Sequence, residues 1–165
     1  MKGESVIGVI FDKEKEKVLL IKRMDVPVFV LPGGGIEADE SPEEAMCREI
    51  KEETGLEVKI IRKIGEYSPQ NRLTRFTHLF ECDPIGGDLK TGQETKELNF
   101  YPLHALPKLI PPPFRRWIFD ATTCHSFIRK PIEGATYLDL IRSIIFHPIL
   151  VLRFFLSKWG MPLNR

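Results

Sequence analysis

The chain has 165 residues, of which 42% are hydrophobic and 28% are charged, and its formal net charge at pH 7 is +1. This length fits one globular domain with a continuous core and argues against a second full domain. Three cysteines, Cys47, Cys82 and Cys124, form no CxxC pair, which argues against a disulfide framework or a zinc site. The apolar run near the N-terminus is too short for a secretion signal. We therefore expect a cytoplasmic protein with reduced thiols.

The charge is unevenly distributed along the sequence. Residues 37–57 carry nine acidic side chains against Arg48 and Lys51, whereas residues 101–165 carry nine Lys or Arg against three acidic side chains. This asymmetry predicts an acidic site and, separately, a basic tail that can meet anions.

The first elements predicted from the sequence are strands. Residues 5–11 form a β-branched run, and a second apolar run follows at residues 18–21. The charged segment DKEKEK between them is typical of a turn, so we predict a β-hairpin. Residues 26–31 form a short extended stretch. We expect it to end at Pro32, because proline and the three glycines after it are poor strand formers.

A helix is predicted over residues 41–54. Ser41 can cap its N-terminus, Pro42 suits the first helical position, and Glu44 completes a capping box. Gly55 suits the left-handed residue that ends the helix.

The elements after this helix complete the predicted fold. Residues 56–64, 75–82 and 97–103 have strand-like patterns, and residues 111–122 form a proline-started helix. That helix carries three apolar side chains on one face: Phe114, Trp117 and Ile118. The expected fold class is α/β or α+β, a sandwich with a mixed sheet flanked by helices.

The C-terminal segment differs in kind from the rest. We divide the chain into a domain at residues 1–128 and an apolar, basic, helical extension at residues 129–165. Arg142, His147-Pro148 and Arg153 interrupt its apolar stretch, so no window of about 20 uncharged residues can span a membrane.

Two interpretations of this extension stay open. It can form a helical hairpin buried against the domain or against a second copy of the chain, which would make a homodimer. Alternatively, its apolar stripe with basic edges can rest in a membrane interface, which would place the protein at the membrane periphery.

The acidic helix raises the question of what its charge holds. If residues 41–54 are helical, Glu49, Glu52 and Glu53 share an arc of roughly 100°. Like charges at this spacing repel one another, and a cation would compensate them. Ligands that are all oxygen favour Mg²⁺, with Mn²⁺ as a substitute. The plain alternative is that a glutamate-rich helix is a solvated surface.

The spacing of the whole segment favours a site. From Gly34 it follows G-x5-E-x7-R-E-U-x-E-E-x-G-U, where U is a large apolar residue. The matching residues are Gly34, Glu40, Arg48, Glu49, Ile50, Glu52, Glu53, Gly55 and Leu56. This pattern resembles the Nudix box of the Nudix hydrolase superfamily, the MutT-like proteins, and the order of elements from residue 5 to about 122 resembles a Nudix domain.

The resemblance implies a reaction and roles for individual residues. A metal-activated water would attack a phosphorus of a nucleoside diphosphate linked to a further group X. Metal ligands would be Glu49, Glu52, Glu53 and the backbone carbonyl of Gly33. Arg48 would orient Glu49 and Glu40 would anchor the loop. One departure is Phe29, where the family often has Trp.

The general base and the substrate contacts are less well defined by the pattern. The base would be a box glutamate or a downstream acid, Glu94 or Glu97, of which we favour Glu97 as catalytic because it lies at a predicted strand start. Substrate contacts are expected from backbone at two glycines and from three side chains that can meet a phosphate or stack on a base: Gly34, Gly35, Arg72, Arg75 and Tyr67.

The resemblance gives the substrate only as a class of nucleotide, for example ADP-ribose, a dinucleoside polyphosphate or a nucleoside triphosphate. Two rival functions stand beside hydrolysis: a catalytically silent Nudix-fold module that binds a nucleotide or a partner, and a membrane-associated scaffold that works through the tail. The intact set of box carboxylates favours hydrolysis. DNA binding is not expected, because the domain has no basic patch interleaved with aromatic residues.

Overall fold

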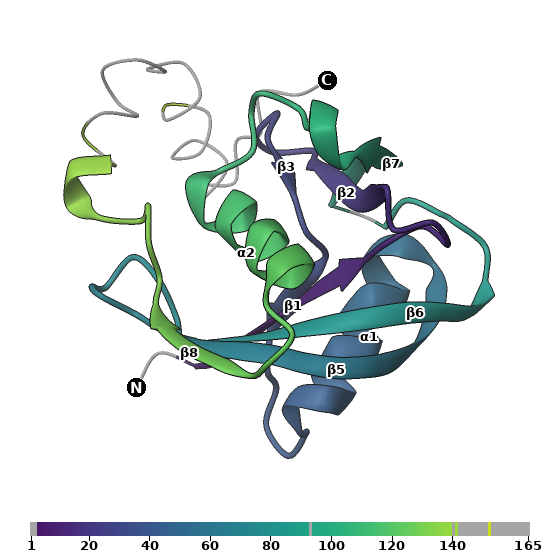
Figure 1. Ribbon diagram of the computed structural model, residues 1–165, viewed down its shortest axis with the longest axis horizontal. Helices are drawn as coiled ribbons and strands as arrows, with labels where there is room; N and C mark the ends of the chain where they lie inside the picture. Colours follow the sequence, from purple (N-terminus) through teal and green to yellow (C-terminus); the bar gives the residue numbers. More distant parts are fainter. Residues whose placement is uncertain (1–2, 93, 140, 142–151, 153–165) are drawn as a thin grey trace.

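The computed structural model describes residues 3–92, 94–139, 141 and 152 (Figure 1). In these residues the strands form two sheets, with the orders β4-β1-β6-β5-β8 and β3-β2-β7. The strands are β1 (Ser5–Ile10), β2 (Lys17–Arg23), β3 (Phe29–Val30), β4 (Gly33–Gly35), β5 (Leu56–Ser68), β6 (Thr77–Gly87), β7 (Thr95–Pro102) and β8 (Ile128–Pro131). The helices are α1 (Pro42–Thr54), the short 3₁₀ turn η1 (Leu103–Ala105) and α2 (Pro112–Thr123).

The five-stranded sheet is mixed, as the sequence predicts. Strand β1 pairs parallel with β6 and antiparallel with β4, while β5 pairs antiparallel with β6 and parallel with β8. Strands β1 and β6 are therefore the centre of the fold, and the elements that carry function attach around them.

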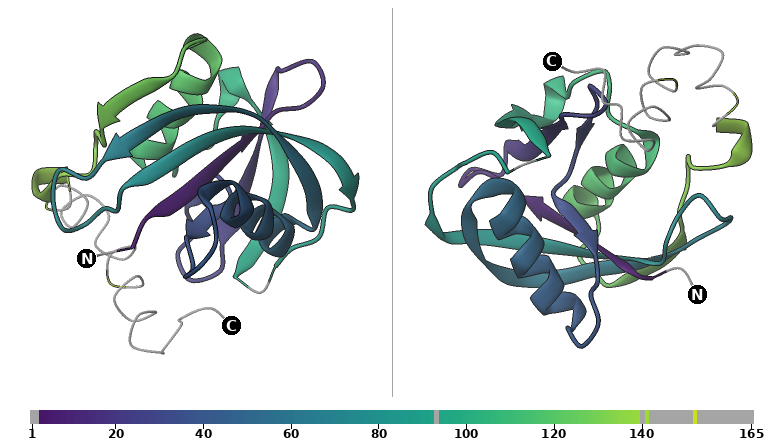
Figure 2. Two further views of the ribbon diagram at one scale, coloured as in Figure 1. Left: turned by 90° about the horizontal axis from the view of Figure 1, so that it is seen from below. Right: turned by 180° about the vertical axis from the view of Figure 1, so that it is seen from behind.

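The two long helices cover opposite faces of this sheet (Figure 2). Successive side chains of a strand point to opposite faces, and β1 illustrates the rule. Val6 belongs to the apolar cluster that contains Met46 of α1, and its neighbour Ile7 belongs to the cluster that contains Trp117 of α2. Gly8 leaves room for α1, because a Cβ there would lie 2.9 Å from the Ile50 side chain. The predicted sandwich is confirmed.

Helix α1 begins and ends where its local signals predict. The Glu44 N–H donates to Ser41 Oγ at 3.2 Å, and the Ser41 N–H donates to the Glu44 carboxylate at 2.8 Å. Gly55 is left-handed, with φ of 76°, and its N–H donates to the Lys51 carbonyl. Both ends of the acidic helix are therefore fixed by short-range chemistry.

The predicted β-hairpin is wrong. Strands β1 and β2 exist, but only the isolated bridge between Phe11 and Val18 joins them, and the two strands belong to different sheets. The chain reverses at the charged turn, but long-range partners, β6 for β1 and β7 for β2, pair with the strands instead.

The extended segment ends before Pro32 as predicted, because β3 stops at Val30, but the expectation that the three glycines form no strand is wrong. Gly33–Gly35 form β4, which pairs antiparallel with β1. At Gly33 φ is 150°, and a Cβ there would collide with the Val6 carbonyl oxygen. Glycine is needed here because the two backbones approach so closely.

The predicted boundary between residues 128 and 129 falls inside a strand. Residues 128–131 form β8, which pairs with β5 at the sheet edge, so the start of the predicted helical extension is a strand. Most of that extension lies outside the described residues, and with it the predicted hairpin, dimer contact and membrane contact. Among the residues that the structure describes, every helix is too short or too polar to cross a bilayer.

Candidate active site

A cavity of about 840 Å³ lies where α1, β4 and the end of β2 meet. Ten residues line it: Arg23, Gly33, Gly34, Glu49, Glu52, Glu53, Arg75, Gly92, Glu94 and Thr95. The three box carboxylates therefore face the glycines of β4 and two arginines. The cavity is large enough for a small-molecule ligand.

Arg48 is the structural hub of the acidic helix. Its guanidinium donates to both carboxylate oxygens of Glu40, at 2.7 and 3.1 Å, and to the Gly35 carbonyl at 3.0 Å. Its Nη1 donates to Glu49 at 3.0 Å and lies 3.6 Å from Glu52. The hydrogen bonds that Arg48 donates to Glu40 and Glu49 raise the pKa of Arg48. Arg48 thus ties the helix to β4 and holds Glu49.

Glu40 holds the loop that precedes the helix. Besides its paired hydrogen bonds with Arg48, one of its oxygens accepts the Glu37 N–H at 2.7 Å. The hydrogen bond from Arg48 lowers the pKa of Glu40 and keeps it charged. Glu40, which was expected to anchor the loop, thus connects the loop to Arg48 of the helix.

Glu53 and Glu49 are held close to the glycine strand. The Gly33 N–H donates to Glu53 Oε2 at 2.8 Å. A Cβ on Gly34 would overlap the Glu49 carboxylate. Burial raises the pKa of Glu53 to about 7, and the charge of Glu49 adds to this; burial also raises the pKa of Glu49. Two partly desolvated carboxylates thus line the same cavity next to β4.

The donor set fits a hard divalent cation in chemistry. Carboxylate and carbonyl oxygens are the ligands that Mg²⁺ and Mn²⁺ take in proteins. Glu52, with 61% of its side chain exposed, lines the cavity next to Glu49 and Glu53. Within the described residues, no three His, Cys, Asp or Glu side chains already converge into a chelate. The residues that would hold the cation are present, with Glu49 engaged by Arg48 and Glu53 by Gly33.

Comparison with known proteins decides the family. The family model described as NUDIX domain matches residues 1–121. The chain belongs to the Nudix family. An ADP-ribose pyrophosphatase of Methanocaldococcus jannaschii is 46% identical over 111 residues, which cover 64% of each chain. The chain thus matches under two thirds of that relative's length.

Two further similarities agree with the Nudix assignment. A putative 8-oxo-dGTP diphosphatase of Bacillus subtilis is 40% identical over 113 residues, 68% of this chain and 75% of that one. The solved structure of a NUDIX hydrolase from Nitrosomonas europaea has a TM-score of 0.67 at 21% identity and covers 84% of this chain and 99% of that one. The last similarity supports the Nudix fold alone.

Of the side chains predicted to contact substrate, only Arg75 lines the cavity of about 840 Å³, which we call the Nudix cavity. Arg72 is exposed in the turn before β6 and does not line it. The prediction for Tyr67 is wrong, because its side chain is only 2% exposed and its hydroxyl donates to the buried Asp120 at 2.8 Å. Tyr67 belongs to the core beneath α2, where no substrate base can stack on it.

Of the two downstream acids, Glu94 and not the favoured Glu97 lies at the cavity. Glu94 lines the cavity, with 80% of its side chain exposed. Glu97 does not line it: its carboxylate accepts from Lys22 at 3.2 Å and from the Tyr101 hydroxyl at 2.7 Å. Glu97 therefore lies on the β2–β7 surface outside the cavity. Of the two acids, Glu94 is the better placed to act as the general base.

Arg23 is the charged cavity residue that the sequence did not suggest. It ends β2, where the register with β7 shifts, and donates to both oxygens of Asp25 at 2.8 Å. The hydrogen bond to Asp25 raises the pKa of Arg23. No motif marks an arginine at a strand end, so only the bulge-induced placement brings it opposite the Nudix carboxylates.

Proposed function

We propose that the chain is a metal-dependent pyrophosphohydrolase that cleaves the pyrophosphate bond of a nucleoside diphosphate linked to a further group. One observation carries the proposal: the cavity sets three carboxylates of α1 against the glycines of β4 and the guanidinium groups of Arg23 and Arg75. Carboxylates suit a cation and arginines suit phosphate oxygens. A pyrophosphate bridging the two would use both sides of the cavity.

The proposal gives roles to the box carboxylates, to Arg48 and to the glycines of β4. Glu49, Glu52 and Glu53 would hold Mg²⁺, or Mn²⁺ in its place, together with the Gly33 carbonyl. When bound, the cation activates a water and neutralises phosphate oxygens. Arg48 positions Glu49 through its hydrogen bond of 3.0 Å. The glycines of β4 admit the phosphates without a Cβ in the way.

The proton of the attacking water needs an acceptor. The carboxylates that line the cavity are the candidates, and they are the three box glutamates and Glu94. Glu97 is not among them. A carboxylate that lies within hydrogen-bond reach of the attacking water can take its proton.

ADP-ribose is the first substrate to test. The relative from M. jannaschii, 46% identical in the matched region, is an ADP-ribose pyrophosphatase. The relative from B. subtilis, at 40%, is a putative 8-oxo-dGTP diphosphatase, which makes oxidised nucleoside triphosphates the second choice. One Nudix scaffold serves several substrates, so only an assay decides between these.

The test is a substrate panel with controlled metal. ADP-ribose, 8-oxo-dGTP, unmodified nucleoside triphosphates and a dinucleoside polyphosphate are each incubated with the full chain and Mg²⁺, Mn²⁺ or a chelator. Chromatography of the products identifies the bond that is cut. We expect one substrate class to be cleaved fastest and only with metal. Binding without turnover across the panel would contradict hydrolysis and favour a nucleotide-binding module.

A further inference from the structure

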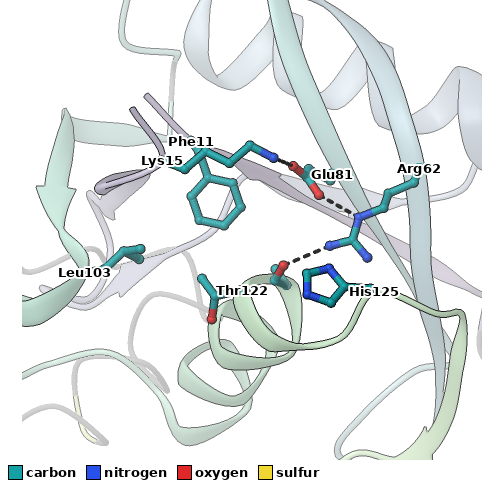
Figure 3. A pocket seen from close by; sticks show the side chains of 8 residues that line it. Phe11, Lys15, Arg62, Glu81, Leu103, Thr122 and His125 are labelled. Atoms are coloured by element: carbon teal, nitrogen blue, oxygen red, sulfur yellow. Dashed lines mark hydrogen bonds and ion pairs between the residues drawn. The ribbon is translucent and has the colours of Figure 1, made fainter. Parts of the chain in front are cut away.

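A second cavity, of about 360 Å³, shares no lining residue with the Nudix cavity (Figure 3). It lies on the α2 side of the five-stranded sheet, between the β1–β2 turn and the C-terminal end of α2. Figure 3 shows Thr122 and His125 from the end of α2 facing Phe11 and Lys15 across it. Neither the Nudix box nor the proposed hydrolysis uses these residues.

A charged triad forms the floor of this cavity. Glu81 of β6 is buried, and it accepts from Lys15 Nζ at 2.6 Å and from Arg62 Nε at 2.7 Å. Burial alone would raise the pKa of Glu81, but the hydrogen bonds from Lys15 and Arg62 lower it. One carboxylate therefore meets two cations, which leaves an excess positive charge at the cavity.

All three nitrogens of Arg62 already donate to the protein, whereas the Lys15 ammonium makes one hydrogen bond. The remaining nitrogens of Arg62 donate to the carbonyls of Ala121 and Cys124 at 2.8 and 2.6 Å, which fastens the end of α2 to the sheet. A lysine ammonium has three donors, and Lys15, with 66% of its side chain exposed, gives one to Glu81. Two donors of Lys15 remain for a ligand.

The turn that carries Lys15 is preorganised. Asp12 Oδ1 accepts the N–H groups of both Glu16 and Lys17 at 2.8 Å, and the Lys15 N–H donates to the Asp12 carbonyl at 3.0 Å. Lys15 itself is left-handed, with φ of 55°. The backbone position of Lys15 is therefore fixed before a ligand binds. This reduces the conformational entropy that is lost on binding.

The walls supply apolar surface and a second polar group. Phe11, Leu103 and Ala121 line the cavity, and Lys15 Nζ lies 6.0 Å from the centroid of the Phe11 ring. Among the described residues, the His125 side chain has no hydrogen-bond partner. Apolar walls with a few convergent polar groups are typical of small-molecule sites.

We propose that this cavity binds a small organic anion, a carboxylate or phosphate monoester on an aromatic or aliphatic body. The anionic group bonds to the spare donors of Lys15 and to His125, and the apolar body lies between Phe11 and the end of α2. The site does not depend on the proposed hydrolase activity.

The experiment is an amide NMR titration of the full chain with three probes of similar shape. Benzoate and phenyl phosphate carry the anion, and benzamide is neutral. We expect one or both anions to shift the amides of Lys15, Thr122 and His125 and to bind at least about tenfold more tightly than benzamide, as expected for a charge-assisted hydrogen bond. The stronger of the two anions tells a carboxylate site from a phosphate site.

Two matched pairs of variants test the assignment. Lys15→Gln should weaken anion binding by about tenfold, while Lys13→Gln, the same charge change on the same turn, should leave it unchanged. Thr122→Phe should fill the cavity and abolish binding, and Thr123→Phe, which does not line it, should not. Equal binding of benzamide, equal effects of the two lysine variants, or absence of binding would overturn the proposal, whether or not the chain hydrolyses a nucleotide.

Discussion

Replacing Tyr67 by Phe tests whether this residue is structural. Its hydroxyl donates to Asp120 at 2.8 Å inside the core, and when that donor is removed Asp120 keeps Lys130, at 2.9 Å, and the weak donor Cys124 Sγ, at 4.0 Å. Burial and the hydrogen bond to Asp120 raise the pKa of Tyr67, so it stays a donor at all ordinary pH values. A hydrogen bond to a charged group contributes about 1.5–3 kcal/mol, and the remaining Lys130 contact favours the lower end.

We therefore expect Tyr67→Phe to lower the free energy of unfolding by about 1.5 kcal/mol. At the size of this chain that corresponds to a fall in Tm of about 3–6 °C. Urea unfolding and thermal melts measure both, and KM for the nucleotide should not change. Tyr137→Phe, at an exposed tyrosine, is the control. Unchanged stability with a raised KM would refute the structural role and return Tyr67 to the substrate site.

Three more predictions follow from other parts of the chain. Gly34→Ala should lower turnover by about 10–100-fold with the fold intact by circular dichroism, because the new Cβ displaces Glu49; Gly86→Ala, where a Cβ lies 3.4 Å from the nearest atom, should not. The lowered pKa of Glu81 contributes stability that is complete above its ordinary value of 4.5 and is lost as pH falls through the lowered value. Below pH 4.5 the free energy of unfolding should therefore fall more steeply with pH in the original chain than in Glu81→Gln. Equal slopes would contradict the pairing of Glu81 with Lys15 and Arg62. Burial raises the pKa of Cys82 to about 12, so a thiol reagent at pH 8 should label it only after unfolding, as peptide mapping can establish.

Local signals predicted the acidic helix and its environment well. The capping box at Ser41, the left-handed Gly55 and the spacing of the carboxylates act over a few residues, so the sequence displays them directly. The same is true of Arg48, whose contacts with Glu40 and Glu49 follow from one helix and the loop before it.

Pairing partners and strand faces could not be predicted in the same way. Whether β1 pairs with β2 or with β6 depends on residues far apart in sequence, which leave no local mark. Strand β5 has register shifts between Ile60 and Arg62 and between Lys63 and Gly65. Each shift changes the face that later residues present, so Tyr67, expected to contact substrate, instead lies in the core. Arg23 was missed for the same reason at the end of β2.

Paired glutamine variants on α1 test the central claim most directly. Glu53 lines the Nudix cavity and bonds to the Gly33 N–H, whereas Glu43 lies in the first turn of the same helix and outside the cavity. With the best substrate and saturating Mg²⁺, Glu53→Gln should lower kcat by at least about a hundredfold without a loss of folded protein, and Glu43→Gln should leave kcat unchanged. Equal kcat values for the two variants would contradict the assignment of the reaction to this cavity.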